Sequence, residues 1–148
     1  MSTRTHRLRC TVIYSFLLGA GLAAATGTEA ARPRHRLPPD YHWGRCLLVV
    51  DGKTRISGLC SYRFEKDGDF QINGPRQVYG GIDFPANAPG FLQMSRDYWA
   101  NIFRERGHWI GYGNSDVRAT HGDYPWEELH RRGACYVNRH VRACLWAK

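Results

Sequence analysis

Apolar and polar stretches follow one another along RCLLVVDGKTRISGLC at residues 45–60, with a cysteine near each end. Two short apolar runs flank Asp51-Gly52, a dipeptide that favours a tight hairpin turn because glycine tolerates positive φ. A three-residue loop starting at Gly52 would place Cys46 opposite Cys60, whereas a two-residue Asp-Gly loop would place Cys46 opposite Ser57. We predict the three-residue loop, because facing positions suit a disulfide.

The same alternation returns in two later regions. In SYRFEKDGDFQIN at 61–73, aromatic and aliphatic residues alternate with polar ones on both sides of a KDGD turn. Near the C-terminus, WEELH, ACYVN and VRACLW are separated by RRG and RH. This pattern predicts a three-strand meander, in which a turn at Arg139-His140 makes Cys135 face Cys144.

The segment between these regions is less uniform. GPRQVYGGIDFPANAPGF at 74–91 is dense in glycine and proline, so we predict a long surface loop. SRDYWANIFRERGHWIGYGN at 95–114 fits a hairpin, but a helix over 95–106 with a Ser95 cap is the alternative. We favour the hairpin because its neighbours are predicted strands. The whole pattern predicts an all-β domain over 41–148, a small antiparallel barrel or sandwich of seven or eight strands.

The first 40 residues differ in composition from this domain. Residues 1–30 carry a basic start, sixteen uncharged and mostly apolar residues, and a stretch of small residues, which is typical of a secretory signal peptide. The apolar run is shorter than the ~20 residues that span a bilayer. Residues 31–40, ARPRHRLPPD, predict a flexible basic leader. We therefore expect a periplasmic or secreted protein without stable membrane insertion.

Removal of the signal peptide changes the cysteine count. Five cysteines become four, since Cys10 leaves with the signal peptide. An even number in a short exported chain predicts two disulfides. No C-x2-C pair is present, as a structural zinc site would require. Of the three possible connectivities we prefer the local one, which joins Cys46 to Cys60 and Cys135 to Cys144.

The charge balance is positive but dispersed. Lys and Arg total 21 and Asp and Glu 13, for a net charge of +8. Three of the arginines and one of the acids lie in residues 1–30, so the chain from residue 31 carries +6. The scattered charges favour an ordinary basic envelope protein, and an acidic partner is the alternative that the positive balance allows.

Two stretches carry a resemblance to known proteins. CLLVVDGKTRISGLCSY and LHRRGACYVNRHVRACLW resemble a group of short exported proteobacterial proteins, over roughly residues 43–147. Tyr136 stands where that group usually has Trp. The resemblance implies an exported β-domain and no particular activity. Size, export and the β-meander are also similar to the periplasmic lysozyme-inhibitor barrels, although the inhibitor loop motif is not recognisable.

One stretch contains the residue types of a catalytic or metal site. THGDYPWEELH at 120–130 contains His121, Asp123 and His130, which predict a small metal-dependent hydrolase as an alternative function. The H-E-x-x-H spacing is absent, and the two histidines are separated by a proline. A polar loop entering a strand is the better interpretation. The sequence therefore favours a non-enzymatic role and predicts no cofactor.

Aromatic residues in the glycine- and proline-rich segments indicate a binding surface. Such segments have no strand to bury a ring, and exposed rings beside arginines suit a sugar or a protein partner. We predict a disulfide-stabilised binding or inhibitor-type envelope protein whose partner is an envelope glycan or a protein. Export makes nucleic acid a poor target. The predicted binding residues are Tyr79, Phe91, Arg96, Tyr112, Arg118 and Tyr124.

Overall fold

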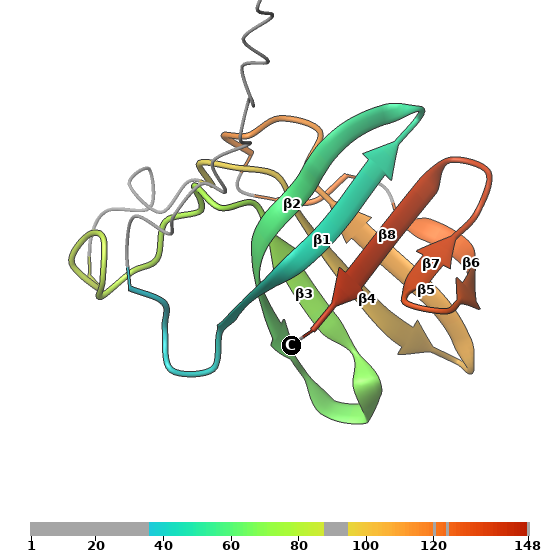
Figure 1. The fold of residues 1–148 in the computed structure, drawn as a ribbon, viewed down its shortest axis with the longest axis horizontal. Coiled ribbons are helices and arrows are strands. Elements are labelled where there is room, and N and C mark those ends of the chain that lie inside the picture. Colours follow the sequence, from blue (N-terminus) through green and yellow to red (C-terminus); the bar gives the residue numbers. More distant parts are fainter. Residues whose placement is uncertain (1–35, 88–94, 120, 124, 148) are drawn as a thin grey trace, which may run out of the picture.

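The protein forms a closed antiparallel barrel of eight strands (Figure 1). The computed structural model describes residues 36–87, 95–119, 121–123 and 125–147. The predicted signal peptide and the first half of the predicted leader lie outside these ranges. The strands are β1 (His42–Val50), β2 (Lys53–Phe64), β3 (Phe70–Asn73), β4 (Trp99–Glu105), β5 (His108–Gly113), β6 (Trp126–Arg132), β7 (Cys135–Val137) and β8 (Val141–Trp146).

Each strand pairs with the next along the chain, and β8 pairs with β1 to close the sheet. In Figure 1, β1 lies between β2 and β8. Side chains alternate between the barrel interior and its outer face, and an eight-stranded barrel is narrow enough for side chains to fill. The fully buried interior residues include Leu48, Ile72 and Ile102. The prediction of an all-β domain is confirmed, and of its two alternative architectures the structure has the barrel and not the sandwich.

The predicted register of the β1–β2 hairpin is wrong. Val50 pairs with Lys53, so the loop contains only Asp51 and Gly52, both with positive φ (49° and 73°). A bulge then shifts the register between Leu48 and Val49, and Cys46 pairs with Gly58 instead of either expected partner. The bulge adds one residue on β2, which neither simple loop length anticipates.

Both predicted disulfides are nevertheless present. Cys60 lies two positions from Gly58 and on the same face of β2, so it reaches Cys46 diagonally, with a Cα–Cα distance of 5.8 Å. Cys135 faces Cys144 directly, as the turn at Arg139-His140 predicted, with a Cα–Cα distance of 3.9 Å. The local connectivity is therefore confirmed. Two disulfides indicate an oxidising environment outside the cytoplasm.

The helix considered for residues 95–106 is wrong, and the hairpin is confirmed. Strands β4 and β5 are joined by a turn at Arg106-Gly107, where both residues have positive φ (49° and 85°). Ala100 and Ile102 are buried while Asn101 between them is only half-buried, which is the period of a strand. The described ranges contain one helical element, the 3-10 turn η1 (Lys66–Gly68). None of their helices is long and apolar enough to cross a membrane.

The two ends of the barrel differ in their connections. At one end, which we call the turn end, short turns join β2 to β3, β4 to β5 and β6 to β7. At the other, which we call the loop end, the long β3–β4 and β5–β6 connections meet the β1–β2 and β7–β8 turns. Long loops on a rigid scaffold are common positions for binding residues. The polar residues of interest are therefore described relative to these two ends.

Candidate functional site

A groove of about 400 Å³ lies on the outer face of β3, β4 and β5. Gln71, Asn101 and Tyr112 form one row across these strands, because Asn101 pairs with both of the others. The row faces outward, since Ile72, Ala100 and Gly111 beside it are buried. We call this feature the outer groove, and its lining residues are Gln71, Gln77, Ser95, Trp99, Asn101, Tyr112, Ala119, His121 and Gly122.

Two aromatic rings form one wall of the outer groove. Trp99 and Tyr112 meet edge to face, with ring centroids 5.7 Å apart. The backbone of Gly122 packs against both rings, and a Cβ there would lie 2.5 Å from Tyr112 and 3.2 Å from Trp99. A hydrogen bond of 2.8 Å from the Asp123 amide to the Gly113 carbonyl holds this loop in place. The wall is thus a fixed aromatic surface, half-buried by its own loop.

Side-chain amides form the floor of the groove. Gln71 accepts a hydrogen bond of 2.7 Å from the Tyr41 hydroxyl and donates one of 3.1 Å to Asn73. The Oδ1 atom of Asn101 is buried and accepts no hydrogen bond from any described residue. A buried acceptor without a donor is destabilising, because it has lost its hydrogen bonds to water.

The loop beside the groove is held by a buried carboxylate. Asp97 is 3% exposed and accepts hydrogen bonds of 2.9 Å from the amides of Arg76 and Tyr98. Asn114 joins the β5–β6 connection to the β3–β4 connection. Its side chain donates a hydrogen bond of 3.0 Å to the Asp97 carbonyl and accepts one of 2.8 Å from the Trp99 amide. The sequence did not predict this network, since Asp97 lies in the segment for which a helix was the alternative. No sequence signal distinguishes it from other loop acids.

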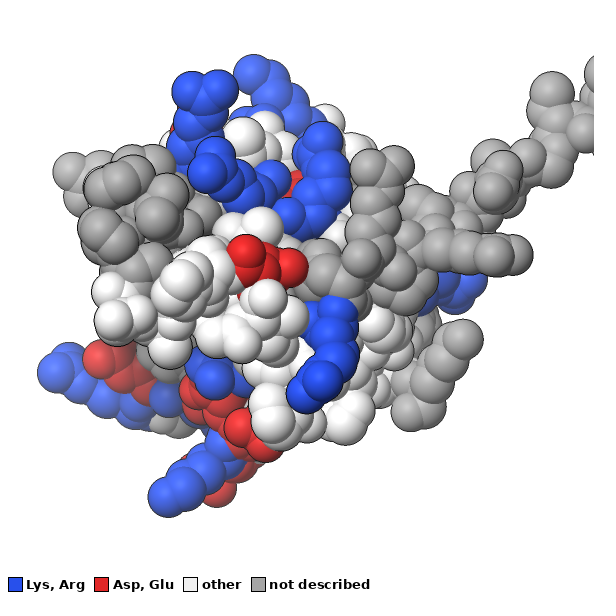
Figure 2. Space-filling model, turned by 90° about the vertical axis from the view of Figure 1, so that its left-hand side faces the viewer, with Lys and Arg blue, Asp and Glu red and all other residues white. Residues whose placement is uncertain are grey.

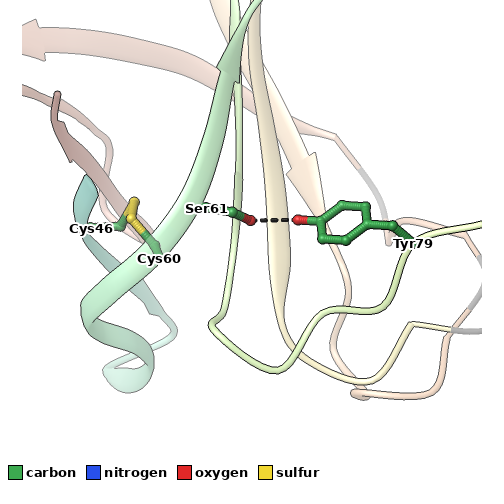
Figure 3. The surroundings of a disulfide bond; sticks show 4 residues. All are labelled: Cys46, Cys60, Ser61 and Tyr79. Carbon is green, nitrogen blue, oxygen red and sulfur yellow. Dashed lines mark hydrogen bonds between the residues drawn. A yellow bond between two sulfur atoms is a disulfide. The ribbon is translucent and has the colours of Figure 1, made fainter. Parts of the chain in front are cut away.

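Tyr79 is not the exposed loop aromatic that its glycine-rich surroundings predicted. Its hydroxyl and the Ser61 hydroxyl are hydrogen-bonded at 2.5 Å, and its ring lies 5.0 Å from that of Tyr41. Figure 3 shows the cause in β2, where consecutive residues point to opposite sides: Cys60 toward Cys46 and Ser61 toward Tyr79. Burial raises the pKa of Tyr79 above its ordinary value, and the Ser61 hydrogen bond partly opposes this. Tyr79 therefore anchors its loop to the barrel.

The remaining predicted binding residues are dispersed. Tyr112 lies in β5 and lines the groove, so the expectation of a loop position is wrong. Arg96 is exposed beside the groove, where its backbone amide donates a hydrogen bond of 3.3 Å to the side chain of Gln77. Arg118 is exposed in the β5–β6 loop. Phe91 and Tyr124 lie outside the described residues.

Charge of one sign does not form a continuous surface near these loops. Figure 2 shows the side of the molecule that lies on the left in Figure 1, where one group of basic side chains lies along the upper margin and a further basic side chain lies nearer the middle. Uncharged side chains and an acidic patch separate the upper group from a mixed group of acids and bases at the opposite margin. This arrangement suits contacts with individual ligand groups better than a uniformly acidic partner.

The structure separates the three residues of the metal-site alternative. His121 lines the outer groove, whereas Asp123 and His130 line a wide pocket of about 870 Å³ at the loop end. In the described parts of the chain, no group of three His, Cys, Asp or Glu residues is arranged to hold a metal ion. The geometry therefore offers no three-ligand centre built from these residues.

The loop-end pocket has a mixed polar lining. The Oδ1 atom of Asp51 and the Nδ1 atom of His140 are hydrogen-bonded at 2.8 Å, and the lining also contains Arg55, Arg139, Glu127 and Glu128. Glu128 has a positive φ of 54°, at the irregular register between β5 and β6. Apart from the half-buried Arg55, the acids and bases that line this pocket are exposed, so it is a solvated surface rather than a shaped site. The outer groove is the better-formed candidate.

Comparison with known proteins adds nothing to this geometry. The chain matches no family model, no curated protein and no solved structure.

Proposed function

We propose that this protein is an exported, non-enzymatic binding protein of the cell envelope, periplasmic or secreted, that holds a saccharide in the outer groove. The observation that carries the proposal is the side-chain amide of Asn101 in the lining of the outer groove. It lies in the same groove as the fixed rings of Trp99 and Tyr112. A ligand that brings both a hydroxyl donor and an apolar face would satisfy both features.

Saccharides have this combination of groups. The C–H faces of a sugar ring pack on aromatic side chains, and its hydroxyls donate and accept hydrogen bonds with side-chain amides. The groove supplies two aromatic rings and the amides of Gln71, Gln77 and Asn101. At about 400 Å³ it is large enough for a small ligand, and its limited size fits one or two sugar rings. Export would bring the protein into contact with envelope glycans.

Isothermal titration calorimetry tests the proposal by measuring the affinity of the protein for soluble peptidoglycan fragments and for lipopolysaccharide core oligosaccharide. Asn101→Ala and Tyr112→Ala should each weaken binding at least about tenfold, since one good polar contact or one aromatic contact is worth roughly 1–2 kcal/mol. Trp146→Ala is the matched control, because Trp146 is a partly exposed aromatic outside the groove. It should bind like the parent.

Two results would count against the saccharide. Equal binding by the parent and both groove variants would show that the ligand sits elsewhere. Inhibition of lysozyme without any affinity for the glycans would favour a protein partner, which is the inhibitor-type role. Thermal denaturation of each variant separates loss of the site from loss of the fold.

A further inference from the structure

A second pocket, of about 350 Å³, lies at the turn end of the barrel. It shares no lining residue with the outer groove. Its residues come from seven strands and two turns, so barrel closure assembles it from distant parts of the sequence. We call it the turn-end pocket and describe it by Phe64, Phe70, Arg104, Trp109, Arg131 and Tyr136.

Aromatic rings form part of its walls. Tyr136 packs against Trp109 and Phe70, with ring centroids 4.6 Å and 5.3 Å apart. Phe64, which pairs with Phe70 across β2 and β3, is 56% exposed at the mouth. An exposed phenylalanine beside a ring-lined concavity is a common feature of ligand sites, because the ligand covers the apolar surface.

Two guanidinium groups lie at the rim above these rings. The Cζ atom of Arg104 is 4.7 Å from the centre of the Trp109 ring, and that of Arg131 is 6.0 Å from the centre of the Tyr136 ring. Neither forms an ion pair within the described ranges. Asp67 is the one acid in the lining, so the pocket carries two positive charges against one negative.

We propose that the turn-end pocket binds a small aromatic carboxylate, as a site separate from the outer groove. The carboxylate would accept hydrogen bonds from Arg104 and Arg131, whose planar guanidinium groups match its geometry. The aromatic body would cover Phe64 and stack on the guanidinium planes or ring edges. A volume near the lower end of ligand-sized pockets suits a body of one or two rings.

The test is a titration of the ¹⁵N-labelled exported protein with 1-naphthoate, monitored by nuclear magnetic resonance. The indole N–H signal of Trp109 should shift, while that of Trp126, which lines the loop-end pocket, should not. The neutral analogue 1-naphthalenemethanol should bind roughly tenfold more weakly, because it cannot form charge-assisted hydrogen bonds. Octanoate, an aliphatic carboxylate, should also bind more weakly than 1-naphthoate.

Paired variants distinguish binding at this pocket from non-specific binding. Arg104→Gln/Arg131→Gln should weaken 1-naphthoate binding about tenfold or more. Arg139→Gln/Arg142→Gln, which makes the same charge change at exposed positions toward the loop end, should bind like the parent. The proposal is overturned if Trp109 does not respond, if the neutral alcohol binds equally well, if octanoate binds more tightly, or if the two double variants behave alike. Dispersed amide signals verify that each variant is folded.

Discussion

Individual residues at the loop end owe their roles to close contacts that leave little space. Gly74 lies directly against the buried carboxylate of Asp97, and a Cβ at this position would approach that carboxylate to 2.3 Å. The carboxylate is held by the amides of Arg76 and Tyr98, so it has little freedom to move away. Gly74 is therefore required by its neighbour rather than by its own backbone conformation.

Gly74→Ala should destabilise the protein by about 1–3 kcal/mol, the usual cost of overpacking a filled position. Gly80→Ala is the matched control in the same loop, where the added Cβ would meet Phe84 at an ordinary contact distance of 3.4 Å. It should change the free energy of unfolding by less than about 1 kcal/mol. Urea denaturation of both variants measures the difference, and equal stability of the two would contradict the Asp97 contact.

Tyr79 links stability to pH. Its pKa is raised in the folded protein by burial, so above about pH 10 the unfolded chain loses this proton before the folded one. The parent should therefore lose stability as pH rises through this range. Tyr79→Phe should cost about 1 kcal/mol at pH 8, through loss of the Ser61 hydrogen bond.

The cost of Tyr79→Phe should shrink or reverse by pH 11, because phenylalanine has no proton to lose. Urea denaturation at the two pH values measures the change. Tyr112→Phe controls for loss of a tyrosine hydroxyl elsewhere on the barrel. A cost that stays the same at both pH values would refute the link between Tyr79 and alkaline stability.

At the level of elements, the two disulfide-bonded hairpins differ in where the sulfur atoms lie. Cys46 and Cys60 are both buried among the core residues of the barrel. Cys135 and Cys144 join β7 to β8 at directly paired positions, and Cys135 is only half-buried. The first bond closes the longer segment, with a sequence separation of 14 against 9.

Removal of the first disulfide should therefore cost more. We expect Cys46→Ala/Cys60→Ala to lose about 3–5 kcal/mol, from the constraint on the unfolded chain and a cavity in the core. Cys135→Ala/Cys144→Ala should lose about 2–3 kcal/mol, since it leaves a smaller internal cavity. Chemical denaturation of the two double variants tests this order. The reverse order would show that the short strand β7 depends on its disulfide more than the core does.

The whole molecule is a closed barrel that presents the outer groove on one face and the turn-end pocket at one end. Two disulfides connect strands within hairpins, and none crosses the barrel. The junction between β1 and β8 therefore rests on strand pairing and interior packing. The closed sheet is the rigid scaffold that both proposed sites require.

Export of the chain has a simple signature. We expect the signal peptide to be cleaved near Ala25 or after Ala30, and the exported protein to lack the mass of four cysteine hydrogens relative to its fully reduced form. Intact mass spectrometry, with and without reductant, measures both. Alkylation of any cysteine before reduction, or an N-terminus that retains residues 1–25, would contradict this.

The strands, the approximate positions of their turns and the disulfide partners could be predicted from the sequence, because each depends on residues close together in the chain, although the length of the β1–β2 loop could not. Alternation marks the strands, glycine marks the turns, and cysteines nine or fourteen positions apart meet across one hairpin. The register at Cys46 could not be predicted, since a bulge depends on how β1 packs against both of its neighbours.

The outer groove was decided by the tertiary structure. The pairing of β4 with both β3 and β5 brings Gln71, Asn101 and Tyr112 into one row, and the loop at Gly122 completes the groove. The same packing buries Tyr79 against Ser61, although the glycine-rich sequence around it predicted exposure. Local patterns determine which segments become strands and which turns join them. Contacts between strands form only once the sheet is assembled, so the outer groove follows from the pairing of β3, β4 and β5, and the turn-end pocket follows from closure of the barrel.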